Sequence, residues 1–235
     1  MSLSWDLHKT VRCFMGLAVF FSVAGILVDI LKYCFGHGHL WEFYPLFHLD
    51  SESNFPNLYQ GVSIATTAFV LRMVSRVVGS QGGPDAGRWR LLSWIFFYVA
   101  LDELTVLHER TIEPLRAVFH TSGALYFAWL ILGFLAVVLL AVIAIPWLKR
   151  LPRSLALWFL AGAFIYLSGT LGMEMVGGWH ASRFGINDLT YALMADTEEI
   201  LEMTGVLVFL SAVVRYVGVL TGSLTVHMSL KGIAE

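Results

Sequence analysis

Three glutamates lie close together within a long apolar stretch, residues 189–220, near the end of the chain. They are Glu198, Glu199 and Glu202, and Asp196 lies just before them. At 100° per residue the three glutamates fall within an arc of roughly 100° on one side of a helix, and the opposite side is apolar. A charged residue at the centre of a membrane-spanning helix costs about 2.5–3.5 kcal/mol. These carboxyl groups must therefore be protonated, paired or bound to a cation.

A second group of acids lies in the stretch 91–113, and one more acid lies near the end of the stretch 154–178. The residues concerned are Asp102, Glu103, His108, Glu109 and Glu174. If the stretches are spanning helices, Asp102 and Glu103 lie about 15 Å below the membrane surface remote from the termini. The glutamates of 189–220 lie about 13–20 Å below the same surface. The two acidic groups therefore overlap in depth.

The deepest carboxyl groups have no matching cation in the sequence. They are Asp102, Glu103, Glu198, Glu199 and Glu202. Carboxylates that lie close together cannot all ionise, because each charge raises the cost of the next. Two solutions remain: several of the groups are protonated, or metal ions supply the missing positive charge.

Carboxylates and a few imidazoles that project inward from helices are the ligands of di-iron and di-manganese bundles. The Glu-x-x-His pair of those bundles is absent, so the sequence predicts a divalent metal ion (iron, manganese or zinc) without specifying a di-iron centre. We expect Glu103, Glu199 and Glu202 to be the main ligands. Further ligands or supporting groups are expected among Asp102, Glu198, Glu174, His108 and Glu109.

A continuous helix over 91–113 limits which of these groups can meet. Asp102 and Glu109 share one stripe of such a helix, Glu103 projects about 100° away from it, and His108 lies on the other flank. Not all of them can then face one point. Pro114 is expected to end or kink this helix.

The composition is that of an integral membrane protein. Of the 235 residues, 57% are hydrophobic and 14% are charged, whereas soluble domains carry about 25% charged residues. The mean hydropathy is +0.73. We predict an all-α, polytopic helix bundle that forms a single transmembrane domain with six spans. The spans are expected at about 11–33, 57–78, 91–113, 124–147, 154–178 and 189–220.

Most of the Lys and Arg residues fall on the side of the N-terminus in this arrangement. The positive-inside rule then places both termini in the cytoplasm. We expect a multi-pass protein of the inner (plasma) membrane, in contact with the lipid bilayer. The net charge is −2 and no basic face is present, which argues against a nucleic-acid partner.

The connection between the first two predicted spans contains three histidines, His37, His39 and His48. The neighbouring acids could join them in collecting a metal ion, but ordinary surface histidines are the simpler interpretation.

The acidic motifs resemble those of a known group of proteins. Leu101-Asp102-Glu103 with His108-Glu109, followed by Glu198-Glu199 and Glu202-Met203 with Gly205, is similar to a group of small multi-spanning bacterial membrane proteins of unassigned function. The resemblance covers the third and sixth predicted spans. It implies that the two motifs belong together, and it supplies no reaction, substrate or cofactor.

Three functions are compatible with these features. In the first, a metal ion activates water or oxygen against a lipid-soluble substrate that enters between helices. In the second, the acids carry protons or a cation in transport, although no helix is broken by paired Gly and Pro as in many carriers. In the third, the chain is a structural or accessory subunit of a larger membrane complex or a homo-oligomer. The motifs assign no catalytic residue.

Overall fold

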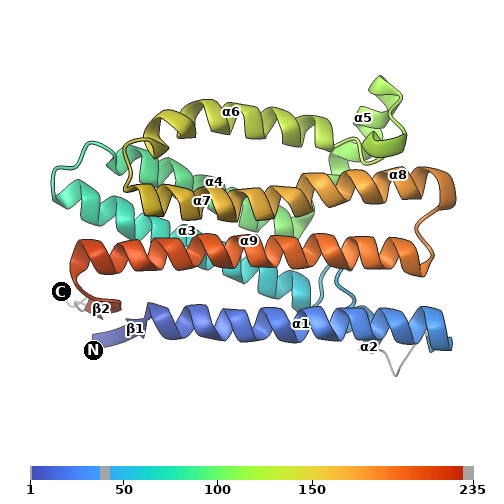
Figure 1. The fold of residues 1–235 in the computed structure, drawn as a ribbon, viewed down its shortest axis with the longest axis horizontal. Coiled ribbons are helices and arrows are strands. Elements are labelled where there is room, and N and C mark those ends of the chain that lie inside the picture. Colours follow the sequence, from blue (N-terminus) through green and yellow to red (C-terminus); the bar gives the residue numbers. More distant parts are fainter. Residues whose placement is uncertain (1, 38–42, 230–235) are drawn as a thin grey trace, which may run out of the picture.

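The computed structural model describes residues 2–37 and 43–229, and this part of the chain forms a bundle of long helices (Figure 1). The helices are α1 (Leu7–Phe35), α2 (Phe43–Phe47), α3 (Phe55–Ser80), α4 (Ala86–Thr105), α5 (Ile112–Phe119), α6 (Leu130–Leu148), α7 (Arg153–Leu167), α8 (Glu174–Phe184) and α9 (Leu189–Thr221). Short 3₁₀ turns cover Glu109–Thr111 (η2) and Gly123–Leu125 (η3), and a π-helical segment, Ser168–Met173 (η4), joins α7 to α8. The protein is therefore all-helical, apart from one short strand pair among these residues.

That pair consists of β1 (Ser2–Asp6) and β2 (Thr225–Ser229), which run antiparallel with Ser2 opposite Ser229. It lies at the end of the bundle where α1 begins and α9 ends (Figure 1). We call this the terminal end and the opposite one the far end. The pairing joins the start of α1 to the chain that leaves α9.

Five helical runs of the described residues are long and apolar enough to cross a membrane. They are Leu7–Phe35, Phe55–Ser80, Leu130–Leu148, Arg153–Phe184 and Leu189–Thr221. Each contains most of a predicted span. A sixth candidate consists of α4 together with the segment Glu109–Phe119, which is bent away from it by 73°.

The bend corrects the prediction for residues 91–113. The helix ends at Thr105, and Val106 adopts a left-handed conformation with φ 54°. Pro114 does not end this helix, because it lies inside α5. No glycine or proline marks the break. The Asp102 side chain stabilises the turn by accepting a hydrogen bond from the His108 backbone N–H at 2.9 Å.

Small residues let α9 approach α7 and η4 backbone to backbone. A Cβ on Gly205 would lie 2.5 Å from the backbone nitrogen of Tyr166, and one on Gly169 would lie 2.7 Å from the carbonyl oxygen of Glu198. Such close packing of helices through glycine is common in membrane proteins. It brings η4 against the acidic segment of α9.

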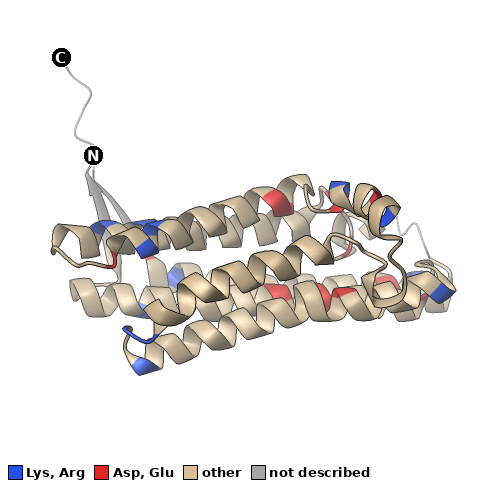
Figure 2. Cartoon of the chain, turned by 90° about the horizontal axis from the view of Figure 1, so that it is seen from above, with Lys and Arg blue, Asp and Glu red and all other residues tan. Residues whose placement is uncertain are grey.

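The terminal half of the bundle has an aromatic core. Trp89 is 1% exposed, and its ring lies 4.8 Å from that of Trp147 and 5.2 Å from that of Tyr216, measured between centroids. Phe159 stacks on Phe209 at 4.3 Å. This half therefore has an apolar interior, whereas the acidic positions gather toward the far end (Figure 2).

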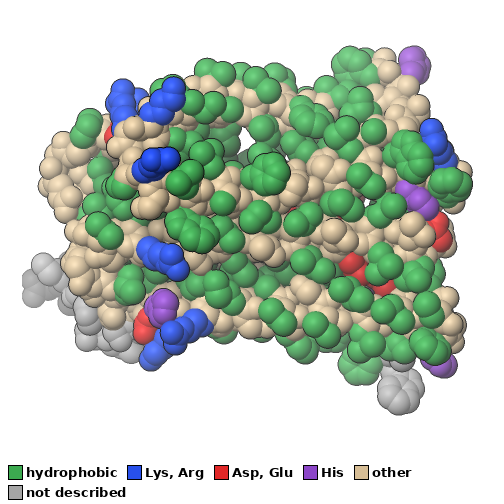
Figure 3. Space-filling view, in the orientation of Figure 1, with side chains coloured by type: hydrophobic (Ala, Val, Ile, Leu, Met, Phe, Trp, Pro, Cys, Tyr) green, Lys and Arg blue, Asp and Glu red, His purple; other side chains and the backbone are tan. Residues whose placement is uncertain are grey.

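Helix α6 is the least embedded of the long helices. Its buried residues are Leu130 at one end and Trp147 near the other, and the residues between them are half-buried or exposed. In the space-filling view the surface is open between α6, along the upper edge, and the helices beneath it (Figure 3).

Candidate functional site

A cavity of about 330 Å³ lies in the far half of the bundle, and all eight predicted site residues line it. They are Asp102, Glu103, His108, Glu109, Glu174, Glu198, Glu199 and Glu202. The two acidic motifs that are about 100 residues apart in sequence thus meet in one space.

Helix α9 supplies one wall of the cavity. The Asp188 side chain caps its N-terminus by accepting a hydrogen bond from the Tyr191 N–H at 2.9 Å, which fixes where the helix begins. The glutamates then fall on its inner side, and Glu202 is only 7% exposed. Gly169 of η4 packs directly on this segment, since a Cβ there would lie 3.1 Å from Glu202 Cγ. The π-helical turn and the acids of α9 are therefore one packed unit.

Helix α4 and its break supply the second wall. His108 Nδ1 lies 2.7 Å from Asp102 Oδ2, so the side chain that caps the break also orients the imidazole. Asn57 donates from Nδ2 to the Glu103 carbonyl oxygen at 2.8 Å. Because the chain turns after Thr105, His108 and Glu109 join Asp102 and Glu103 around the cavity. The prediction that they cannot all face one point assumed a helix that continues to residue 113, whereas the helix ends at Thr105 and the four residues line one cavity.

Glu174 completes the site from α8. It begins this helix, directly after the π-helical segment, and its Oε1 accepts a hydrogen bond from Trp129 Nε1 at 2.9 Å. The Trp129 ring in turn lies 4.6 Å from that of His108, between centroids. Asp102, His108, Trp129 and Glu174 therefore form a connected row along the cavity wall.

Two further acids, which the sequence analysis did not select, also line the cavity. Asp50 and Glu52 lie on the segment between α2 and α3. Enclosure raises the pKa of Asp50 to about 7, with the Glu174 and Glu109 carboxylates adding to the effect and His48 opposing it. The signal that could have identified them is the sequence Asp-Ser-Glu-Ser just before the second predicted span.

The charge balance of the cavity is one-sided. Nine carboxyl groups and one imidazole line it, without a Lys or Arg. Among the described residues, the ion pair that involves a cavity carboxylate is that of Asp102 with His108. Arg116 is turned toward the Tyr126 carbonyl and Glu113. His180 pairs with Asp188 at 2.8 Å and does not line the cavity.

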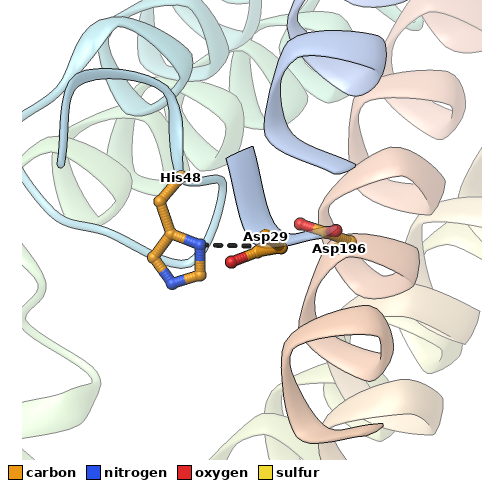
Figure 4. A group of neighbouring side chains, drawn as sticks. All are labelled: Asp29, His48 and Asp196. Atoms are coloured by element: carbon orange, nitrogen blue, oxygen red, sulfur yellow. Dashed lines mark hydrogen bonds and ion pairs between the residues drawn. The ribbon is translucent and has the colours of Figure 1, made fainter. Parts of the chain in front are cut away.

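The cavity acids share a space but are not gathered to coordination distance. In the described part of the chain, one group of three side chains brings its ligand atoms within 4.8 Å of one another, and it lies elsewhere. It consists of Asp29, His48 and Asp196 (Figure 4). The prediction of an ordinary surface histidine was wrong for His48, whose side chain is 13% exposed, whereas His37 is exposed and His39 lies outside the described residues.

Comparison with known protein families adds one observation. Residues 41–217 match the family described as a domain of unknown function, DUF8692. The chain belongs to this family. The match includes all eight predicted site residues, and α1 lies before it. No curated protein and no solved structure matches the chain.

Proposed function

We propose that the cavity binds a divalent metal ion, iron, manganese or zinc, with Glu103, Glu199 and Glu202 as its main ligands. The other predicted site residues serve as further ligands or hold the ligands in position. They are Asp102, Glu198, Glu174, His108 and Glu109. The observation that carries the proposal is the nine carboxyl groups around one cavity without a Lys or Arg. A buried cluster of like charges needs either protons or cations, and a divalent ion neutralises two carboxylates at once.

The size of the cavity suits an ion that keeps part of its water shell. The cavity is large enough to hold several water molecules beside an ion. Carboxylates that are too widely spaced to share one ion directly can bind it through water or after a change of rotamer. Hard ions such as Mn²⁺ accept carboxylate and water oxygens together. The remaining space can hold a substrate group beside the ion.

A lipid-soluble substrate is the partner that fits the access route. Leu132, Gly133 and Ala136 of α6 line the cavity, and so does Tyr98 of α4, whose side chain is 58% exposed on the outside of the bundle. Because these exposed or half-buried residues of α4 and α6 line the cavity, we propose that it opens sideways between the two helices. In a bilayer this opening faces lipid. A metal ion there would activate water or oxygen for attack on a substrate that enters from the membrane.

The same proposal places the protein in the membrane. We also propose a multi-pass protein of the inner (plasma) membrane with both termini in the cytoplasm, and five helical runs of suitable length, with a sixth that is broken at the site, support this placement. The cavity then lies in the outer half. The aromatic core around Trp89 fills the inner half.

That core argues against the transport alternative. A carrier needs polar access to its site from both sides, and the buried Ser75 and Ser93 of the terminal half donate to backbone carbonyls, at 2.8 Å each, and offer no path. The remaining alternative, an accessory subunit, predicts co-purifying partner proteins and indifference to chelators.

Elemental analysis of gently purified protein tests the proposal. We expect about one or two equivalents of metal bound at the cavity, as in carboxylate-bridged bundles. Changing Glu199→Ala and Glu202→Ala together should remove that metal. Glu113→Ala is the matched control, because Glu113 is an acid at the far end with a side chain that is 79% exposed, away from the cavity.

The proposal fails if the double variant, folded and monodisperse, binds as much iron, manganese and zinc as the parent after chelation and reloading. Loss of metal from the Glu113→Ala control would also contradict it, because that result would indicate non-specific binding by surface acids.

A further inference from the structure

The group Asp29, His48 and Asp196 lies apart from the cavity. Asp29 is six residues before the end of α1 and Asp196 is seven residues after the start of α9, so the two antiparallel helices bring them to the same depth, about 10 Å from the far end. His48 follows α2 and reaches them from the side (Figure 4). None of the three lines the cavity, although Leu49, the residue after His48, does.

Asp196 is the unusual member of the group. It is 1% exposed, and neither of its carboxyl oxygens has a hydrogen-bond partner among the described residues. Its carboxyl group is directed toward Asp29 (Figure 4). A buried carboxyl group without a partner is costly unless it is protonated or a ligand supplies the missing partner.

Both carboxyl oxygens of Asp29 are held in place by neighbouring side chains. Tyr44 donates to Asp29 Oδ1 at 3.0 Å, and Lys32 Nζ donates to the Tyr44 hydroxyl at 2.8 Å. Oδ2 lies 3.1 Å from His48 Nδ1. The side chain of Asp29 is 0% exposed. Supporting hydrogen bonds of this kind orient the ligands of metal sites.

His48 is equally fixed. Its ring stacks on that of Tyr44 at 4.8 Å, and its carbonyl accepts a hydrogen bond from Asn54 Nδ2 at 2.7 Å. The next residue, Leu49, packs so closely on α1 that a Cβ at Gly25 would lie 2.4 Å from its Cγ. The segment is therefore built into the bundle, and the imidazole is positioned before any ligand arrives.

We propose that Asp29, His48 and Asp196 form a second divalent-cation site, which joins α1 and α9 to the segment after α2. Two carboxylates and one imidazole, with ligand atoms within 4.8 Å of one another, suit Zn²⁺ or Mn²⁺. The two carboxylates neutralise the ion, and Lys32 forms no ion pair with them in the described part of the chain. The ion takes the place of the proton between His48 and Asp29, and it gives Asp196 the partner that it lacks.

The site is independent of the cavity proposal. It includes Asp29, which lies outside the region that matches the family, whereas His48 and Asp196 lie inside it. Because the segment that holds His48 continues directly into Asp50 at the cavity, an ion here fixes one wall of the cavity without touching its contents.

Metal binding in the Glu199→Ala/Glu202→Ala protein tests the inference, because that background lacks two of the three main ligands proposed for the cavity. Equilibrium dialysis of the chelated protein against Zn²⁺ and, separately, Mn²⁺ should give about one saturable equivalent, as expected for one closed site. Adding Asp196→Asn or His48→Gln should weaken binding by at least about tenfold, and Tyr44→Phe, which only orients Asp29, by about tenfold. Glu113→Gln is the control and should change nothing.

The melting temperature provides a second measurement. Zn²⁺ should raise the melting temperature of the background protein and not that of its Asp196→Asn derivative, whose neutral amide replaces the unpaired acid. Absence of saturable binding in the background overturns the inference, as does binding that survives both Asp196→Asn and His48→Gln. Failure of the cavity proposal has a different signature: the parent and the Glu199→Ala/Glu202→Ala protein bind the same amount, and Asp196→Asn still removes one equivalent.

Discussion

The far and terminal halves of the bundle are built from the same long helices, yet they have opposite interiors. Helix α9 contributes Glu202 to an acidic cavity in the far half and Phe209, two turns later, to an aromatic core in the terminal half. The polar interior requires breaks and close approaches: the left-handed Val106, the π-helical η4 and the glycine contacts of α9. The aromatic interior needs only regular helices. Irregular backbone is thus concentrated where polar groups are buried.

This difference separates what stability and function require. Burying carboxyl groups opposes folding, whereas packing large rings favours it. We therefore expect substitutions in the terminal half to change stability and leave metal binding intact, and substitutions in the cavity to do the reverse. Each prediction below probes that separation.

The largest effect is expected at the junction of the two halves. Gly205→Leu places a side chain where a Cβ alone would lie 2.5 Å from the Tyr166 nitrogen and 2.7 Å from its Cα, and backbone atoms cannot move aside. We expect no folded protein by size-exclusion chromatography in detergent, because α7 and α9 cannot pack. Gly16→Leu is the control, since nothing lies within 4 Å of a Cβ there. A folded Gly205→Leu protein would mean that this contact does not set the helix spacing.

The next effect concerns the aromatic core. Trp89→Ala should lower the free energy of unfolding by about 3–5 kcal/mol, the usual range for removing a buried aromatic ring. Trp94→Ala, five residues along the same helix and 59% exposed, should cost much less. Both variants should keep their bound metal, as measured by elemental analysis. Loss of metal from folded Trp89→Ala protein would contradict the separation of the two halves.

The sequence predicted most of the long helices, but it did not predict the break after Thr105 or the contact between Asp29, His48 and Asp196. Hydropathy and length define the long helical runs, and the period of a helix is enough to place Glu198, Glu199 and Glu202 on one side. The break after Thr105 was missed because its left-handed residue is a valine, one of the residues least suited to that conformation. Local pattern gives no reason to expect it, and the Asp102 side chain that stabilises it acts from four residues away.

The Asp29, His48 and Asp196 group was missed for a different reason. Its members come from three segments, and helical periodicity says which face a residue occupies without saying which helix it meets. The sequence offered one indication: Asp29 lies near the end of the first predicted span, and Asp196 lies near the start of the sixth, which runs in the opposite direction. Only the packing of α1 against α9 brings the two carboxyl groups into contact.

At the break after Thr105, a substitution is expected to stabilise the protein, by less than the two preceding substitutions destabilise it. A left-handed conformation costs a non-glycine residue about 1–2 kcal/mol, so Val106→Gly should raise the free energy of unfolding by about 1 kcal/mol after the entropy of glycine is included. Val138→Gly, at an exposed position inside α6, should lower it by about 1 kcal/mol. Chemical denaturation in detergent measures both. A destabilised Val106→Gly protein would show that the valine side chain stabilises the break.

The smallest effect distinguishes two helix caps at opposite ends. Asp188 caps α9 at the far end and Asp6 caps α1 at the terminal end. The pKa of Asp188 is lowered chiefly by the hydrogen bond from His180, and that of Asp6 chiefly by the backbone N–H of Lys9. A lowered folded pKa means that each ionised group stabilises the protein above its unfolded pKa of about 4. That contribution is lost as the pH falls through the folded pKa.

Asparagine keeps the capping geometry and removes the charge, so it isolates the electrostatic part of each cap. Asp188→Asn should lower the melting temperature at pH 6, and its difference from the parent should shrink as the pH falls below about 4. In a His180→Gln background the effect of Asp188→Asn should be smaller, because its main partner is gone, whereas the effect of Asp6→Asn should be unchanged. Equal effects of Asp188→Asn in both backgrounds would mean that His180 does not stabilise the ionised Asp188, and that the two caps respond to acid in the same way.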